Sequence, residues 1–347
     1  MHKGRGSSEN PPNRFHSFHK EPEGEDYTEE IAAPRTQFII DHSQSIISSN
    51  DSPDIPYEYS INPYRGCEHG CAYCYARPTH EYLDFSSGLD FETRILCKQN
   101  APELLRKKLS SHSWKPQPIA FSGVTDPYQP VEKRLEITRQ CLAVLAEFRN
   151  PVMIVTKNHL VTRDLDILKE LARWNAVSVA ISLTTLDREL GRQLEPRAST
   201  PQRRLEAIQA IHQAGIPVGM LTAPIIPGLT DHEIPALLKA GAEAGAGWAY
   251  YEILRLPHAV KELFTQWLEH YYPEKKERVL NRIRAVREGK LSDANFHTRL
   301  SGTGLFAEQI GRLFEVSCQR LGLNKAHVAL SSDSFRRPMS GQLELPL

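Results

Sequence analysis

Three cysteines within eight residues are the most reactive group in this sequence: Cys67, Cys71 and Cys74. Gly66 and Gly70 lie beside them and let the backbone fold around a ligand, because glycine adopts positive φ values freely. Thiolates select soft metals and iron-sulfur clusters. Four cysteines usually hold a cubane cluster, so a cubane on three would leave one iron open to a further ligand. The spacing therefore predicts a cluster that binds a substrate and does more than carry electrons.

The cysteine triplet also fits two alternatives to a cluster. A structural zinc site would take His69 or His80 as its fourth ligand, but such sites normally use two ligand pairs separated by a long loop. No second pair exists, since Cys97, Cys141 and Cys318 are scattered along the chain. The second alternative is three ordinary core cysteines, which would not crowd into eight residues between glycines. In a reducing compartment, closely spaced cysteines indicate metal ligands rather than disulfides, and we favour the cluster.

The wider segment 62–77 reads NPYRGCEHGCAYCYAR. Its C-x3-C-x2-C spacing, with the aromatic Tyr73 directly before the last cysteine, resembles the signature of the radical S-adenosylmethionine (SAM) superfamily. The whole segment is similar to the branch grouped with spore photoproduct lyase, and the similarity extends through residues 55–290. The resemblance implies that the three cysteines hold a 4Fe-4S cluster. It also implies that SAM binds the open iron through its methionyl amine and carboxylate.

The chemistry implied by this resemblance is reductive cleavage of SAM. An electron from the reduced cluster would give methionine and a 5′-deoxyadenosyl radical, which abstracts hydrogen from a substrate that the sequence does not identify. An electron donor such as a flavodoxin or a ferredoxin would be the protein partner. The alternatives are DNA repair like that of spore photoproduct lyase, and a zinc-stabilised nucleic-acid-binding module without catalysis.

Short apolar runs alternate with helical patterns over most of the chain. This alternation predicts βαβ units, an α/β fold and a parallel sheet. Six strands are fewer than a complete eight-fold barrel requires, and the resemblance implies a partial (β/α)6 TIM-type barrel. The expected strands are 57–64, 118–122, 151–156, 177–183, 217–223 and 248–254, and the expected helices are 131–148, 162–173, 201–214, 231–244, 273–290 and 303–321.

Composition divides the chain into three segments. Residues 1–50 are polar and predict a flexible or loosely docked N-terminal extension. Residues 51–290 form the barrel, and 291–347 a C-terminal helical extension and tail. Basic and acidic residues balance at forty-two each, so no global field attracts nucleic acid, although the basic run in 273–290 could contact phosphates or form a solvated helix face. Neither a membrane span nor a signal peptide is predicted, so we expect a cytoplasmic protein without a membrane partner.

The SAM site is expected at the carboxyl ends of the strands, where parallel α/β folds bind ligands. Lys157, which follows the third strand, could face the ligand or the solvent. By resemblance, the planar guanidinium of Arg197 binds the SAM carboxylate, and Glu195 holds this guanidinium in position. The alternative is a purely structural ion pair between Glu195 and Arg197. The residues expected to bind the cofactor are Tyr73, Gly123, Thr125, Asp126, Ser182, Thr184, Glu195, Arg197, Pro224 and Ile226.

One cysteine outside the motif is a candidate catalytic group. In the lyase branch, a thiol donates a hydrogen atom to the product radical. Cys141 and Cys318 lie on helix rows that are expected to pack in the core. Cys97 is therefore the remaining candidate for this donor.

Overall fold

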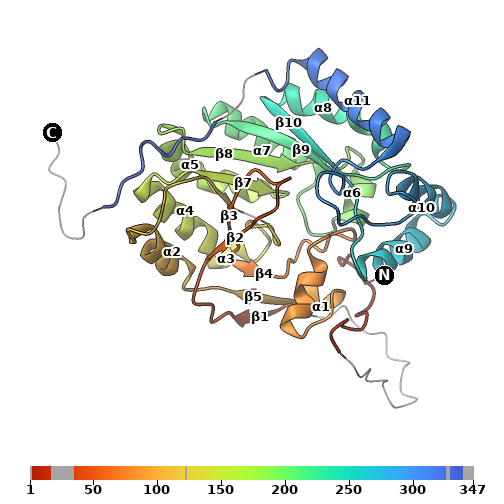
Figure 1. Cartoon of the computed structure of the whole chain (residues 1–347), viewed down its shortest axis with the longest axis horizontal. Helices are drawn as coiled ribbons and strands as arrows, with labels where there is room; N and C mark the ends of the chain where they lie inside the picture. Colours follow the sequence, from red (N-terminus) through yellow and green to blue (C-terminus); the bar gives the residue numbers. More distant parts are fainter. Residues whose placement is uncertain (1, 17–34, 122, 326–328, 339–347) are drawn as a thin grey trace.

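The computed structural model describes residues 2–16, 35–121, 123–325 and 329–338. Seven strands of this described part form the main sheet, in the order β10-β9-β8-β7-β6-β3-β2 (Figure 1). Each neighbouring pair from β3 to β10 is parallel, and β2 pairs antiparallel with β3 at the edge. The bounds are β2 (Ile47–Ser49), β3 (Tyr59–Ile61), β6 (Ile119–Phe121), β7 (Val152–Thr156), β8 (Val177–Ser182), β9 (Val218–Ile225) and β10 (Trp248–Ile253).

Six consecutive parallel strands, ending at β10 without returning to β3, make an open sheet. The predicted α/β fold with a partial (β/α)6 barrel is therefore confirmed. The strands form where apolar and β-branched residues run together, because a parallel sheet is covered on both faces. β8, with the sequence VSVAIS, is buried at every position. Its near-continuous apolar run is the reason that the sequence revealed it.

Helices lie outside the sheet, from α4 and α5 at the left of Figure 1 to α8 and α11 at the top. The expected helix 131–148 is divided at Glu136, whose φ of 53° interrupts the helical backbone. The expected helix 162–173 begins with a 3-10 turn before α5. The crossover elements are α3 (Glu132–Leu135), α4 (Ile137–Phe148), η2 (His159–Asp164), α5 (Leu165–Ala172), α6 (Arg188–Leu194), α7 (Pro201–Gln213), η3 (Asp231–Glu233) and α8 (Ile234–Glu243).

Side-chain caps start two of these helices close to the site. The Asp187 carboxylate accepts hydrogen bonds from the first-turn amides of α6. The Thr200 hydroxyl caps α7, and Pro201 occupies its first turn, where a missing N–H costs nothing. The short turn between the end of α6 and the Thr200 cap, residues 195–199, lies against the cysteine segment, where the Arg197 amide donates to the His69 carbonyl at 3.3 Å.

Several elements were not predicted. The remaining helices are η1 (Arg77–Leu83), α1 (Leu89–Thr93), α2 (Ala101–Ser110), α9 (Val260–Tyr271), α10 (Lys276–Ala285) and α11 (Gly304–Leu321), of which only the last two were expected. A second sheet has the order β1-β5-β4, with β1 (Gln37–Ile40), β5 (Arg94–Cys97) and β4 (Tyr64–Arg65). The expected strand 57–64 is thus two strands in different sheets, since the chain turns at Asn62-Pro63.

The described parts of residues 1–50 lie on the barrel. β1 pairs with β5 and β2 pairs with β3. Residues 2–16 run beside α1 and α9, where Figure 1 shows the N-terminus. Residues 17–34 and 339–347 lie outside the described part of the chain, and the three-segment division of the chain stays a prediction. None of the described helices is long and apolar enough to span a membrane.

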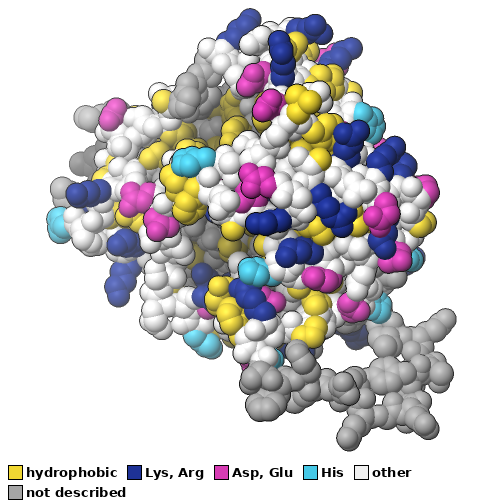
Figure 2. All heavy atoms as spheres, turned by 45° about the vertical axis from the view of Figure 1, so that its right-hand side comes forward, with side chains coloured by type: hydrophobic (Ala, Val, Ile, Leu, Met, Phe, Trp, Pro, Cys, Tyr) yellow, Lys and Arg dark blue, Asp and Glu magenta, His cyan; other side chains and the backbone are white. Residues whose placement is uncertain are grey.

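Two of the basic residues of 273–290 are engaged within the protein. Arg287 is 2% exposed and donates to backbone carbonyls, among them that of Ile253 at 2.7 Å. Lys276 pairs with Glu269 at 3.2 Å. On the face shown in Figure 2, Lys and Arg side chains are interspersed with Asp and Glu. The surface there favours a solvated helix face over a phosphate-binding stripe.

Candidate functional site

The three motif cysteines line one pocket at the carboxyl ends of the barrel strands. They lie on the loop between β4 and η1, hereafter the cysteine loop (residues 66–76). Backbone hydrogen bonds hold this loop from two sides. The Cys67 amide donates to the Phe91 carbonyl at 2.8 Å, and the Ala72 amide donates to the Leu194 carbonyl at 2.9 Å.

The electrostatics of the thiols fit a cationic cluster. Burial raises the pKa of the Cys71 and Cys74 thiols, and repulsion from neighbouring motif cysteines raises it further. Three thiols that face one pocket and repel one another when ionised would be stabilised by bound iron, which deprotonates coordinating thiols. No three His, Cys, Asp or Glu side chains of the described chain are gathered as ligands of one metal ion. A cubane requires a wider arrangement, since each thiolate binds a different iron.

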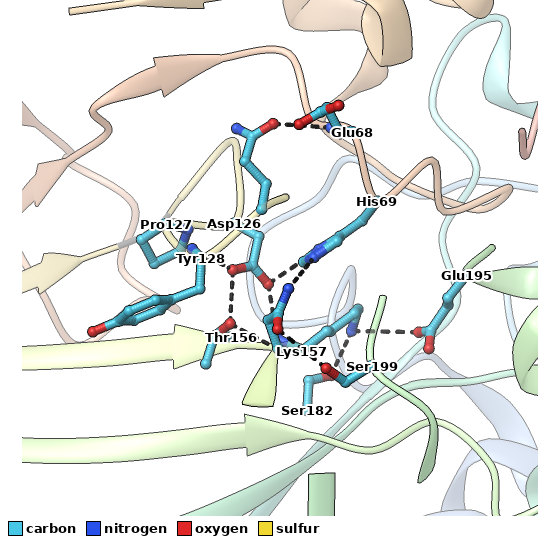
Figure 3. A network of polar contacts seen from close by, with 12 residues as sticks. Glu68, His69, Asp126, Pro127, Tyr128, Thr156, Lys157, Ser182, Glu195 and Ser199 are labelled. Carbon is cyan, nitrogen blue, oxygen red and sulfur yellow. Dashed lines mark hydrogen bonds and ion pairs between the residues drawn. The ribbon is translucent and has the colours of Figure 1, made fainter. Parts of the chain in front are cut away.

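His69 and Asp126 join the cysteine loop to the barrel (Figure 3). His69 is 1% exposed, and its Nδ1 lies 3.4 Å from an Asp126 oxygen. Burial opposes protonation of His69, but the charges of Asp126 and Cys67 outweigh it and raise the pKa of His69 to about 10. The same Asp126 oxygen accepts the Lys157 amide at 2.7 Å. The carboxylate thus connects the loop to the end of β7.

Both oxygens of Asp126 are engaged within the protein. The second oxygen accepts the Tyr128 amide at 2.8 Å and the Thr156 hydroxyl at 2.7 Å. Gln129, from the same turn and fully buried, accepts the Glu68 amide at 2.9 Å and donates to the Gly66 carbonyl at 3.1 Å. The turn after β6 therefore holds the cysteine loop, a role that the sequence did not indicate for Gln129.

A second buried network lies behind the pocket. The Tyr73 hydroxyl donates to Glu195, which also pairs with Arg204 on α7. Burial acts to raise the pKa of Glu195, but Arg204 and Lys157 outweigh it and lower it to about 2. Burial and the negative charge of Glu195 raise the pKa of Tyr73 well above its usual value. Tyr73 therefore keeps its hydroxyl proton and donates a hydrogen bond to the ionised carboxylate of Glu195.

Lys157 faces the pocket and not the solvent. Its side chain is 16% exposed and lies 3.7 Å from Glu195. Its ammonium donates to the Ser182 hydroxyl at 2.5 Å and to the Ala223 carbonyl at 3.2 Å. Figure 3 shows it between Ser182 and Glu195. A cation held against a pocket wall by fixed acceptors is suited to bind a carboxylate, and the sequence had left this residue undecided.

Most residues expected to bind the cofactor lie in or beside this pocket. Thr184 lies one layer behind it, where its hydroxyl donates to Glu195 at 2.8 Å. Ile226 is fully buried in the core with Leu229 and Leu254, so its side chain does not reach the pocket. The expected residues that line the pocket are Tyr73, Gly123, Thr125, Asp126, Ser182 and Pro224.

The expected Glu195–Arg197 pair is wrong. Glu195 pairs with Arg204 and Lys157, whereas Arg197 pairs with Glu68 at 3.1 Å. The Arg197 amide also donates to the His69 carbonyl at 3.3 Å, because the 195–199 turn directs this residue toward the cysteine loop. Arg197 does not line the pocket, and its contact with SAM stays a prediction.

The remaining cysteines lie elsewhere. Cys97 is 1% exposed on β5 in the second sheet, and it does not line the pocket. Burial raises the pKa of its thiol to about 11. Cys141 and Cys318 lie in the main hydrophobic core, as expected from their helix rows. The role of Cys97 as hydrogen donor stays a prediction that no contact with the pocket supports.

Neither histidine proposed as a fourth zinc ligand offers a free nitrogen to the pocket: His69 is engaged at both ring nitrogens, and His80, whose Nδ1 has no hydrogen-bond partner among the described residues, does not line the pocket. Both ring nitrogens of His69 are engaged, Nδ1 with Asp126 and Nε2 with the Asn158 amide at 3.2 Å. His80 Nε2 lies 3.0 Å from the Arg94 carbonyl, and burial lowers the pKa of His80 to about 4. These contacts favour the cluster over the zinc site.

The side of the pocket formed by β10 carries residues that the sequence did not reveal. Glu252 and Arg255 line it, and their side chains make no hydrogen bond or ion pair with another described residue. The Arg255 guanidinium lies 4.4 Å from the Tyr75 ring centroid, and Tyr75 donates to the Gly123 carbonyl at 2.6 Å. The sequence could have indicated Glu252, because it is a glutamate within an otherwise apolar and aromatic strand, WAYYEI.

The chain has relatives in bacteria and in a phage. The uncharacterised protein Rv2578c of Mycobacterium tuberculosis (strain ATCC 25618 / H37Rv) is 41% identical over 250 residues, 70% of this chain and 74% of that protein. The radical SAM Nα-GlyT isomerase of Pseudomonas phage M6 is 28% identical over 227 residues, 59% of this chain and 45% of that protein.

The fold has solved counterparts. Spore photoproduct lyase, in complex with a dinucleoside spore photoproduct, superposes with a TM-score of 0.58 at 16% identity, over 82% of this chain and 80% of that one. This likeness shows a common fold. Residues 61–240, which include the cysteine loop and the strands from β4 to β9, match the Radical SAM superfamily. The chain therefore belongs to the radical SAM superfamily.

Proposed function

We propose that Cys67, Cys71 and Cys74 hold a 4Fe-4S cluster at which SAM is cleaved reductively. When bound, the cluster and SAM supply a 5′-deoxyadenosyl radical for hydrogen abstraction. One observation carries the proposal: the three thiols open onto the same pocket as the ends of β6, β7, β8, β9 and β10. An electron donor such as a flavodoxin or a ferredoxin would supply the electron.

Within this pocket, Lys157 is suited to bind the methionyl carboxylate of SAM. Its ammonium has three N–H donors, and two face Ser182 and the Ala223 carbonyl. The Glu195 carboxylate lies 3.7 Å from the Lys157 ammonium and also pairs with Arg204, so two cationic side chains share one carboxylate. Because Glu195 and Arg204 are both buried, Lys157 is held in place before the ligand binds, and the site is preorganised.

The β10 side is suited to bind the substrate. Arg255 presents a guanidinium whose Nε is buried without a partner, and Glu252 presents a carboxylate. Burial raises the pKa of Glu252, so a hydrogen-bond donor from a ligand would stabilise its charged form. The exposed Tyr75 ring beside Arg255 adds a flat surface. Together these groups suit a planar substrate with both donors and acceptors, and a nucleobase is one such group.

A lyase-like hydrogen donor is not supported. All six cysteines lie in the described chain, and the three that line the pocket are the proposed cluster ligands. Repair of the kind carried out by spore photoproduct lyase would need a different hydrogen donor here, and we do not propose it.

The test is anaerobic incubation of the iron-reconstituted protein with SAM and a chemical reductant, followed by chromatography for 5′-deoxyadenosine. Wild type should produce it. Alanine at any one of the three motif cysteines should remove most of the bound iron and all of the product. Cys318→Ala, the matched control in the hydrophobic core, should keep both. Iron loading that survives in all three motif variants would refute the assignment.

A further inference from the structure

Residues 2–16 lie directly on the outside of the cysteine loop. Gly6 packs against Gly70 so closely that a methyl group at Gly6 would lie 1.7 Å from the Gly70 carbonyl oxygen. A methyl group at Gly70 would in turn lie 3.4 Å from the Gly6 nitrogen. Arg5 and Ser7, on either side, are only 7% and 2% exposed. Two glycines thus let the backbone of the N-terminal segment touch the backbone of the loop.

A continuous path of polar contacts joins this segment to one of the cysteines. The Gly6 amide donates to Glu92 Oε2 at 3.0 Å, and Glu92 Oε1 pairs with Arg77 at 2.5 Å. Glu92 and Arg77 are fully buried. Arg77 Nε then donates to the Cys71 carbonyl at 3.0 Å. Because a buried carboxylate is costly without its partners, loss of the Gly6 amide would disturb the group that orients Cys71.

The segment is attached along its length. Glu9 accepts the Leu89 amide through its carbonyl at 3.1 Å, and its side chain accepts from Gln266 on α9 at 2.6 Å. Asn10 exchanges two hydrogen bonds with Asp90 on α1: its amide donates to the carboxylate at 3.0 Å, and its oxygen accepts the Asp90 amide at 2.8 Å. Because these contacts join residues that are far apart in the sequence, they hold residues 2–16 in one specific position on α1 and α9.

We propose that residues 2–16 are a positioning strap that fixes the cysteine loop through Glu92 and Arg77 and closes its outer side against water and oxygen. The inference rests on the proposed cluster. The barrel and its strands already enclose the inner side of the loop, where the pocket lies. On the outer side, the contacts at Gly70 belong to the strap and to Glu92. The strap therefore governs how far this face of the loop is open to solvent.

The experiment compares Gly6→Val with wild type after anaerobic reconstitution. Gly6→Val cannot dock without displacing the Gly70 carbonyl, so its cluster should bleach several-fold faster in aerated buffer, followed by visible absorption. Hydrogen exchange should also rise at the amides of 70–74. Gly247→Ala is the control for a glycine substitution away from the strap, because its methyl group would meet only the Val218 carbonyl oxygen at 3.9 Å. Asn10→Ala, which removes the Asp90 pair without a clash, should give an intermediate bleaching rate.

The outcomes separate the two proposals. If wild type itself loads no cluster, the proposed function fails and the strap's role fails with it. If wild type loads a cluster and Gly6→Val bleaches at the wild-type rate, the strap alone is overturned. If Gly6→Val does not fold, Asn10→Ala decides, and a wild-type bleaching rate in that variant overturns the strap.

Discussion

Two sides of the pocket use the same residue types in opposite ways. On the cysteine-loop side, Asp126 has four donors around its carboxylate, and Glu195 is bound by Tyr73 and Arg204. On the β10 side, Glu252 and Arg255 have no hydrogen bond or ion pair from another described side chain. All of these charged groups lie at or near a pocket wall, so position alone does not separate them.

The difference lies in how much of each group's hydrogen-bonding capacity the protein uses. A carboxylate whose acceptor positions are filled stabilises the fold and has little left for a ligand, whereas an unfilled one keeps a desolvation cost that a ligand can relieve. We infer that the loop side is framework and that the β10 side contacts the substrate.

The largest effect is expected from Asp126→Asn. The amide N–H₂ would replace either the oxygen that accepts the Thr156 hydroxyl or the oxygen that accepts the Lys157 amide, so in either orientation a buried donor would face another donor. Leaving a buried donor unsatisfied costs about 1–3 kcal/mol, so the free energy of unfolding of the iron-free protein should fall by that amount. Iron loading should fall with it. Denaturant titration and iron analysis provide the two measurements.

Glu252→Gln is the matched control, because it makes the same chemical change in a carboxylate with no protein partner among the described residues. It should leave the free energy of unfolding and the iron content near wild type at neutral pH. Equal destabilisation by the two variants would abolish the distinction between framework and substrate side.

A smaller effect is expected from Arg255→Ala. The variant loses the contact with Tyr75 and the electrostatic attraction of Arg255 for Glu252, but no hydrogen bond or ion pair with another described residue. An exposed cation–π pair contributes about 0.5–1 kcal/mol. Iron content and 5′-deoxyadenosine formation without substrate should therefore persist. The check is denaturant titration with product analysis in the absence of substrate. Loss of the iron would place Arg255 in the framework after all.

The smallest effects are differences in pH dependence. The pKa of Glu195 in the folded protein is lowered to about 2. Its contribution to stability is therefore fully present above the pKa of the unfolded chain, and it is lost as the pH falls from there through the folded pKa. Glu195→Gln should therefore be destabilised at neutral pH, with a deficit that shrinks in acid. The pKa of Glu252 is raised by burial, so its stabilising contribution is lost as the pH rises. Glu252→Gln should gain slightly on wild type with rising pH.

Melting temperatures of wild type and the two variants, measured across the pH range in which all three fold reversibly, check these signs. Parallel curves for Glu195→Gln and Glu252→Gln would show that the two carboxylates do not differ in environment.

The parallel strands from β6 to β10 were predictable to within a few residues because they are short runs of mainly apolar residues, and β6 to β9 are mostly buried. The expected 177–183 is β8 (Val177–Ser182), and 217–223 overlaps β9 (Val218–Ile225). The second sheet was not predictable in this way. β1 is four residues long with Phe38 39% and Ile40 53% exposed, so no periodic burial marks it.

The sequence by itself determined the cysteine loop, since its three thiols and its glycines lie within a few residues and local geometry controls their reach. It also determined the parallel α/β sheet, because alternating strand and helix patterns admit few topologies, whereas the partial barrel was implied by the family resemblance. Only the tertiary structure decided the partners of each charge: Arg204 and not Arg197 for Glu195, and His69 for Asp126, 57 positions away. The tertiary structure also decided that the backbone of Gly6 packs against the backbone of Gly70. Such pairs form when the fold brings distant segments together, and residue type does not encode that choice.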